Sequence, residues 1–191
     1  MVSLLYRDIT PLLEPAAEAA ARLCLPTDWQ MYCNGRNAVL RAGRLTAVLL
    51  LRELLAERGE ALPPAPLRHG DGSGKPRFAD DRYSFSVSHG GAMAAVALGD
   101  REEVGVDIEP LSALPAPRRA RIAAHFFDPA AAERCEGDPA RFTHEWTRLE
   151  AAYKAGAPTP PPPRDRHLST RRVRDNLRRL YFLSLCVLPR F

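Results

Sequence analysis

The chain has 191 residues, of which 46% are hydrophobic and 26% are charged, and its formal net charge is +4. That length suits one domain with a substantial core or two small lobes. No stretch approaches the roughly 18 uninterrupted apolar residues of a membrane span, and the first residues lack the basic start and apolar run of a signal peptide. We therefore expect a globular, cytoplasmic protein without a membrane partner.

The cysteines and lysines indicate which kinds of site the chain can form. The sequence holds four cysteines, Cys24, Cys33, Cys135 and Cys186. They form no C-x-x-C pair, so we expect them to be reduced and buried and predict neither a zinc site nor a disulfide framework. Lys75 and Lys154 are the only lysines among the 27 basic residues. This bias suggests that these two positions need a compact ammonium and not a planar guanidinium, although chance explains it equally well.

The first part of the chain predicts a strand followed by helices. We expect a strand at residues 4–9, an Ala-rich helix at residues 14–24 and a long, one-sidedly apolar helix at residues 36–58. The loop at residues 70–76 contains Gly74-Lys75, as a phosphate-binding loop would, but Pro76 stands where such a loop requires Ser or Thr. We therefore do not predict a phosphate-binding loop of that kind.

Three short strands are expected next, at residues 83–87, 92–98 and 104–109. Gly-containing turns separate them, which predicts an antiparallel meander. Helices are expected at residues 118–127 and 139–155.

The end of the chain matches no simple pattern. A proline-rich segment at residues 158–163 interrupts the fold, and residues 164–191 carry eight arginines and two aspartates. Periodicity does not decide whether the apolar run at residues 180–188 is a strand or a helix. Because prolines remove backbone donors that a continuing sheet would need, we expect this tail to stay outside the core.

Two acidic motifs carry the chemistry. On a strand, Asp107 and Glu109 would share one face, and on a helix Glu150 and Lys154 would be neighbours. Together they would bring three carboxylates beside an ammonium, and such oxygen ligands favour Mg²⁺. Each half also has a plain alternative, a solvated strand face for the first and a surface ion pair worth about 0.3 to 0.5 kcal/mol for the second.

Four motifs in this order resemble the 4′-phosphopantetheinyl transferases, particularly the larger, monomeric kind. They are Gly74-Lys75-Pro76, Phe85-Ser86-Val87-Ser88-His89, Gly105-Val106-Asp107-Ile108-Glu109 and the segment from Trp146 to Lys154. The resemblance implies an α+β fold of two pseudo-symmetric lobes, each a small antiparallel sheet packed on a long helix. It places the lobes at residues 1–103 and 104–157, with the metal site at their interface and a tail of uncertain structure at residues 158–191.

The resemblance also implies the reaction and its residues. The family transfers the phosphopantetheine arm of coenzyme A to a serine of an acyl or peptidyl carrier protein and releases 3′,5′-ADP. By position, the magnesium ligands would be Asp107, Glu109 and Glu150, with Glu150 also accepting the serine proton. Lys154 would neutralise the transferring phosphate. The coenzyme A phosphates would be held by Lys75, Ser88 and His89, and its 3′-phosphate more weakly by Arg36 and Arg44.

Two departures from the family pattern leave alternatives open. Leu149 stands where the family usually has a lysine, which implies a missing phosphate-side cation, and the tail implies an incomplete second lobe. A non-catalytic relative that only binds coenzyme A or a carrier is therefore the main alternative. A nucleic-acid-binding protein is the more distant one, suggested by the sequence pI of about 9.1, but no recognition motif supports it.

Overall fold

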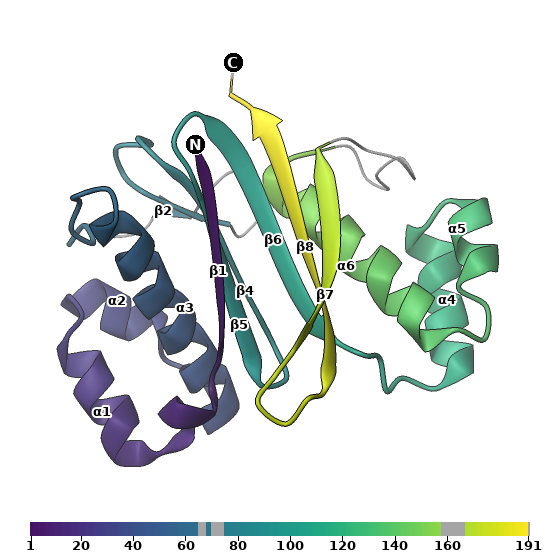
Figure 1. Cartoon of the computed structure of the whole chain (residues 1–191), viewed down its shortest axis with the longest axis horizontal. Coiled ribbons are helices and arrows are strands. Elements are labelled where there is room, and N and C mark those ends of the chain that lie inside the picture. The colour runs from purple at the N-terminus through teal and green to yellow at the C-terminus, as the bar shows by residue number, and fades with distance from the viewer. Residues whose placement is uncertain (65–67, 70–74, 158–166, 191) are drawn as a thin grey trace.

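The computed structural model describes residues 1–64, 68–69, 75–157 and 167–190. Two three-stranded antiparallel sheets form its centre, one in the order β1-β5-β4 and the other in the order β6-β8-β7. Helix α3 covers the outer face of the first sheet and helix α6 that of the second, so the layers run helix, sheet, sheet, helix (Figure 1). The expected α+β class, with two antiparallel sheets on long helices, is confirmed.

The first sheet and its helices come from the N-terminal half. Their bounds are β1 Val2–Asp8, η1 Thr10–Leu13, α1 Pro15–Leu23, α2 Thr27–Tyr32, α3 Ala38–Ala56, β4 Ser84–Gly90 and β5 Met93–Gly99. Asn37 caps α3 by accepting a hydrogen bond from the backbone N–H of Leu40. Strand β5 is buried on both faces, because Val96 and Leu98 pack toward α3 while Ala95 and its alternate neighbours face the second sheet.

The second sheet uses the rest of the chain. Its elements are β6 Glu102–Pro110, α4 Ala116–Phe126, α5 Pro129–Arg134, α6 Pro139–Ala155, β7 Leu168–Arg174 and β8 Leu180–Pro189, and the short pair β2 Arg68–His69 and β3 Pro76–Arg77 lies apart from both main sheets. Asp138 caps α6 by accepting from the N–H groups of Ala140 and Arg141, and Gly156 ends the helix in the left-handed conformation.

The predicted meander is wrong at its third strand. Strands β4 and β5 pair as expected, but β6 pairs with β8 and not with β5. The reason is that β5 already has a neighbour on each edge, with β1 on one side and β4 on the other. The chain therefore crosses after Gly99 and starts the second sheet.

The prediction that the C-terminal run stays outside the core is also wrong. Residues 180–188 lie in β8, the central strand of the second sheet, between β6 and β7. Tyr181, Leu183 and Cys186 are each at most 1% exposed. Burial on both faces explains why the run shows no clean polar alternation. The segments at residues 70–74 and 158–166, including the interrupting prolines, lie outside the described residues.

Serine hydroxyls join the two sheets along the neighbouring edges of β4 and β6. The side chains of Ser84, Ser86 and Ser88 on β4 project toward β6. Their Oγ atoms accept from the backbone N–H groups of Val104 at 3.3 Å, Val106 at 3.0 Å and Ile108 at 3.3 Å, respectively. These hydroxyls occupy the place of a neighbouring strand's carbonyls, so the edge of β6 is satisfied without a backbone ladder. We call this boundary the serine seam.

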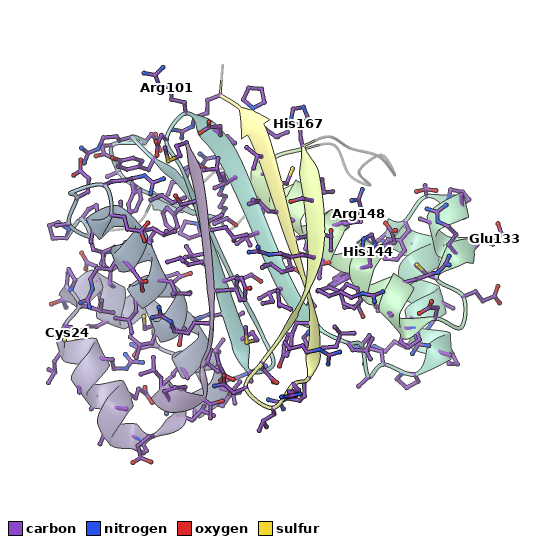
Figure 2. The ribbon with its side chains drawn as sticks, in the orientation of Figure 1. Cys24, Arg101, Glu133, His144, Arg148 and His167 are labelled. Carbon is purple, nitrogen blue, oxygen red and sulfur yellow. The ribbon has the colours of Figure 1, made fainter. Side chains whose placement is uncertain are left out.

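Cysteine burial was predicted correctly for three of the four thiols. All four are free, but Cys24 is exposed just after α1, at the outer side of the helical layer (Figure 2). Burial raises the pKa of Cys33 to about 12 and that of Cys135 to about 11, so neither is a reactive thiolate. Among the described residues, no helix combines the length and apolar character needed to cross a membrane.

Candidate active site

A cavity of about 520 Å³ lies along the serine seam. It is lined by Tyr32, Arg44, Lys75, Pro76, Ser86, Val87, Ser88, His89, Asp107, Glu109, Trp146, Glu150, Tyr153 and Lys154. The structure thus brings together every residue that the sequence nominated except Arg36. Arg36 is exposed before the start of α3 and does not line the cavity.

Strand β6 presents the carboxylates as strand alternation predicts. Val106 and Ile108 pack in the core between the two sheets, while Asp107 and Glu109 face the cavity. Asp107 is 3% exposed, so it is a buried carboxylate and not part of a solvated strand face.

Helix α6 supplies the opposite wall. Trp146, Glu150, Tyr153 and Lys154 follow the helical repeat and line the same cavity. Gly105 allows this helix to approach β6 closely, since a Cβ at that position would lie 2.0 Å from the backbone oxygen of Ala151. The glycine therefore sets the distance between the acidic strand and the acidic helix.

Lys154 is held against Asp107. Its Nζ donates to Asp107 Oδ1 at 2.7 Å, to the backbone oxygen of Val106 at 3.2 Å and to Ser88 Oγ at 3.4 Å. Ser88 in turn donates to the same Asp107 oxygen at 2.8 Å. The other oxygen, Oδ2, is buried and has no hydrogen-bond partner. Lys154 thus forms its ion pair with Asp107, and not with Glu150 as the plain alternative for the helical motif had it.

The neighbouring carboxylates are electrostatically strained. Burial, followed by the charge of Asp107, raises the pKa of Glu109 to about 7, and Lys154 opposes this shift only in part. Burial also raises the pKa of Glu150, with Asp107 adding to the effect. An added cation between these groups would offset both the desolvation cost of the buried carboxylates and their mutual repulsion.

These residues fit a hard divalent ion, although they are not closed around one. The orphaned oxygen of Asp107 and the all-oxygen donor set with Glu109 and Glu150 suit Mg²⁺. Within the described residues, however, no group of three or more His, Cys, Asp or Glu side chains has the spacing of a metal cluster. The magnesium ligands therefore stay a prediction.

An arginine and a histidine line the other part of the cavity. Arg44 of α3 donates to the backbone oxygen of Asn34 at 2.5 Å. His89 packs closely against α3 at Gly43, where a Cβ would come within 2.9 Å of its ring. Burial, then the charges of Arg44 and Lys154, lowers the pKa of His89, so the imidazole is neutral at pH 7.

Lys75 and Ser88 lie in the cavity wall with their polar atoms already engaged. Lys75 is 7% exposed, and its Nζ donates to the backbone oxygen of Val104 at 2.8 Å and to Glu103 Oε2 at 3.2 Å. Ser88 accepts from Ile108 and donates to Asp107. Besides these contacts with β6, Lys75 donates to Ser84 Oγ at 3.3 Å and Ser88 accepts from Lys154 at 3.4 Å.

The side chain of Leu149 does not face the cavity. It is 8% exposed and belongs to an apolar cluster with Ala123, Phe127 and Phe142. A lysine at this position would enter that cluster, so the structure does not support the prediction that a phosphate-side cation is missing here.

Sequence reasoning missed several lining residues. Trp146 and Tyr153 lie within a recognised motif and share the helical face of Glu150, so their periodicity could have identified them. Tyr32, by contrast, reaches the cavity from α2 through tertiary packing and carries no local signal. Gly43 could have been noticed, because a glycine inside a helix costs about 1 kcal/mol and suggests a close contact.

Comparison with known proteins bears on the same region. Residues 103–171, which include β6 and α6, match the family model of the 4′-phosphopantetheinyl transferase superfamily. The predicted family resemblance is confirmed.

Two curated relatives agree with that match, and both are named "Putative 4′-phosphopantetheinyl transferase". The protein from Synechocystis sp. is 35% identical over 119 residues, which cover 58% of this chain and 48% of the relative. The protein from Haemophilus influenzae is 41% identical over 70 residues, which cover 35% of this chain and 30% of the relative. The matched part of this chain thus spans half or less of each relative's length.

Proposed function

We propose that the protein transfers the 4′-phosphopantetheine group of coenzyme A to a serine of an apo acyl or peptidyl carrier protein, which gives the holo carrier and 3′,5′-ADP. The observation that carries this proposal is that Asp107, Glu109 and Glu150 line the same cavity as the cations Lys154 and Arg44. Six of the fourteen residues that line the cavity, from Asp107 to Lys154, belong to the segment that matches the transferase superfamily.

In the proposed reaction, the carrier serine Oγ attacks the phosphorus bonded to the pantetheine arm. A new O–P bond forms, and the bond from that phosphorus to the bridging oxygen breaks, so 3′,5′-ADP leaves with the electron pair. Glu150 would accept the serine proton directly or through water, and because burial raises its pKa, it is a stronger base than an exposed carboxylate. A carrier serine held on the side of the phosphorus opposite the leaving 3′,5′-ADP would give the in-line geometry of this displacement.

The cavity's cations would bind and orient coenzyme A. Lys154 would turn from Asp107 toward the transferring phosphate, and Arg44 would bind a remaining phosphate through its charge. The neutral His89 would donate one ring N–H to the same phosphates. Asp107, Glu109 and Glu150 would hold Mg²⁺, which when bound would neutralise charge on the phosphoryl oxygens. Lys75 and Ser88 would contribute to the wall of the site through β6.

Intact mass spectrometry tests the proposal. The protein is incubated with coenzyme A, Mg²⁺ and several apo carrier proteins, and we expect one phosphopantetheine on the carrier serine. Asp107→Asn should slow transfer by at least about a hundredfold. The variant loses the ion pair with Lys154 but keeps an oxygen in the same place to accept from Ser88 and Lys154, so the fold should be retained at a lower melting temperature.

A matched control, Asp28→Asn, removes a carboxylate from the first turn of α2, outside the cavity lining. It should leave the rate unchanged. If transfer persisted after complete chelation, the reaction would not require a divalent ion. Coenzyme A binding by a folded sample without transfer to any carrier would favour the non-catalytic alternative.

A further inference from the structure

The only two lysines of the chain make matching contacts on the serine seam. Lys154 donates to the carbonyl of Val106, to Ser88 Oγ and to the Asp107 carboxylate. Lys75 donates to the carbonyl of Val104 at 2.8 Å, to Ser84 Oγ at 3.3 Å and to the Glu103 carboxylate at 3.2 Å. Each ammonium therefore binds one edge carbonyl, one seam serine and one carboxylate of β6.

This repetition follows from the geometry of a strand edge. Alternate residues of β6 point both their N–H and their C=O groups at β4, and serines take the N–H groups of Val104 and Val106. Serine hydroxyls leave the carbonyls of those residues in need of donors. A compact ammonium with three donors can reach a carbonyl and two flanking oxygens at once, whereas a planar guanidinium directs its donors into a fixed fork.

The Glu103 carboxylate that accepts from Lys75 also accepts from three other side chains. Glu103 also accepts from Arg190 at 2.8 Å, from Arg77 at 3.1 Å and from Ser84 at 2.9 Å. Although burial alone would raise it, these partners and Lys75 lower the pKa of Glu103 to about 2. Burial lowers the pKa of Lys75, and Glu103 opposes that shift. The pair is thus a shielded ion pair within a larger hydrogen-bonded group.

We propose that Lys75 is a positioning residue for the acidic strand and not a ligand of the coenzyme A phosphates. It fixes β6 at Glu103 and Val104, four and three residues before Asp107, and thereby sets where Asp107 and Glu109 stand in the cavity. The role of those carboxylates as metal ligands comes from the proposed function, and this inference rests on it to that extent. Lys154 makes the same contact within the site, whereas Lys75 makes it at the far end of the seam.

Two affinities distinguish the roles. Lys75→Met removes the ammonium, and Glu103→Gln removes the charge of the carboxylate that pairs with it. Coenzyme A and Mn²⁺ binding are then measured by calorimetry. A positioning role predicts that both variants bind Mn²⁺ at least tenfold more weakly, with coenzyme A affinity changed less than threefold. If Lys75 were a phosphate ligand, Lys75→Met would give the opposite result, and Glu103→Gln, which removes the carboxylate charge beside the ammonium, would leave coenzyme A binding intact or stronger.

The matched control is Arg77→Met, which removes one partner of Glu103 but leaves the contacts of Lys75 with Ser84, Glu103 and Val104. It should preserve both affinities. Weaker coenzyme A binding without weaker Mn²⁺ binding in Lys75→Met would overturn the proposal, and so would unchanged Mn²⁺ binding. If Lys75→Met does not fold, Ser84→Ala removes one acceptor of the same ammonium, and the same comparison of the two affinities decides.

A further readout separates this proposal from the proposed function. Hydrogen exchange of the Val104 and Val106 amides, which bond to the seam serines, should accelerate in Lys75→Met and Glu103→Gln but not in Arg77→Met. If wild-type protein binds neither ligand, the proposed function fails, while amide exchange still tests the positioning role. Unchanged exchange in both variants would overturn the positioning role alone.

Discussion

The side chain at position 149 immediately precedes Glu150, yet it points into a different environment. Glu150 lines the cavity, whereas Leu149 packs on Ala123, Phe127 and Phe142. Adjacent residues of a helix are separated by about 100° around its axis, so they rarely share a contact surface. Position in a motif therefore does not by itself place a side chain in the site.

Leu149→Lys tests this arrangement. We expect the melting temperature to fall by several degrees, because an ammonium would be buried among apolar groups and about 1 kcal/mol corresponds to roughly 2 to 4 °C at this chain length. The transfer rate should not increase. Leu149→Met, which conserves volume, is the control and should change both quantities little. A faster enzyme with an unchanged melting temperature would show that a lysine here reaches the cavity.

The site residues differ in how far their sequence context could predict them. Asp107 and Glu109 depend only on strand alternation, and Glu150 and Lys154 only on the helical repeat, so local periodicity was sufficient to group them. The Lys154 to Asp107 contact joins two such elements, and it required knowing how closely α6 approaches β6. Tyr32 and the contact of His89 with Gly43 depend on the packing of α2 and α3 and have no comparable local pattern.

At the scale of elements, the distance between α6 and β6 is the critical quantity. Gly105→Ala would place a Cβ 2.0 Å from the backbone oxygen of Ala151 and 2.6 Å from the backbone nitrogen of Ala155. Because these atoms belong to a helix backbone, the helix must move as a unit. Glu150 and Lys154 would then shift relative to Asp107.

We therefore expect Gly105→Ala to lower both the melting temperature and the transfer rate, the latter by at least tenfold. Thermal unfolding and intact mass measure the two effects. Gly59→Ala is the control, since a Cβ there meets nothing within 4 Å and only the positive φ of 72° is strained. It should cost stability without loss of rate. A fully active Gly105→Ala variant would mean that the helix position is not critical.

The contact of β6 with the end of the chain has its own pH signature. The pKa of Glu103 falls from 4.5 in the unfolded reference to about 2 in the folded protein. A lowered carboxyl pKa means that the unfolded chain binds the proton more readily in acid. The contribution of Glu103 to stability is therefore fully present above about pH 4.5 and is lost as the pH falls toward 2.

Glu103→Gln should accordingly reduce the loss of stability between about pH 4.5 and 2, while lowering the melting temperature by several degrees at pH 7. Thermal unfolding across that pH range measures the slope. Glu57→Gln, at the exposed end of α3, controls for the removal of one carboxylate. Equal acid slopes in wild type and Glu103→Gln would contradict the assignment.

Element types were more predictable than element partners. The helix at residues 139–155 was predicted with its observed bounds, and the Asp138 cap and Gly156 stop explain why. The pairing of β6 with β8 was not predicted, because it joins residues far apart in the sequence and periodicity carries no record of a partner strand. The serine seam likewise appears only when β4 and β6 are side by side.

For the whole molecule, the C-terminal hairpin completes a core that both sheets share. Val106 of β6 and Leu183 of β8 pack in one cluster with Ala95 of β5, so residues from both halves of the chain bury one another. The turn between β7 and β8 also contacts the first sheet, where the Asn176 N–H donates to Asp8 Oδ2 at 3.1 Å. The hairpin is therefore part of the fold and not an appended tail.

Truncation after Ala157 should abolish cooperative unfolding of the second sheet. Strand β6 would lose its ladder partner from Glu102↔Pro189 to Pro110↔Tyr181, and the apolar groups of the shared core would be exposed to water.

A single substitution in β8 tests the same point with a smaller change. Leu183→Ala, at 1% exposure, should cost about 2 to 5 kcal/mol, whereas Leu177→Ala in the same hairpin, at 74% exposure, should cost little. Calorimetry of the three proteins measures these differences. Equal stability of the two leucine variants would mean that β8 does not support the core. A truncated chain that unfolds at the wild-type temperature would mean the same, and would show that the C-terminal hairpin is dispensable.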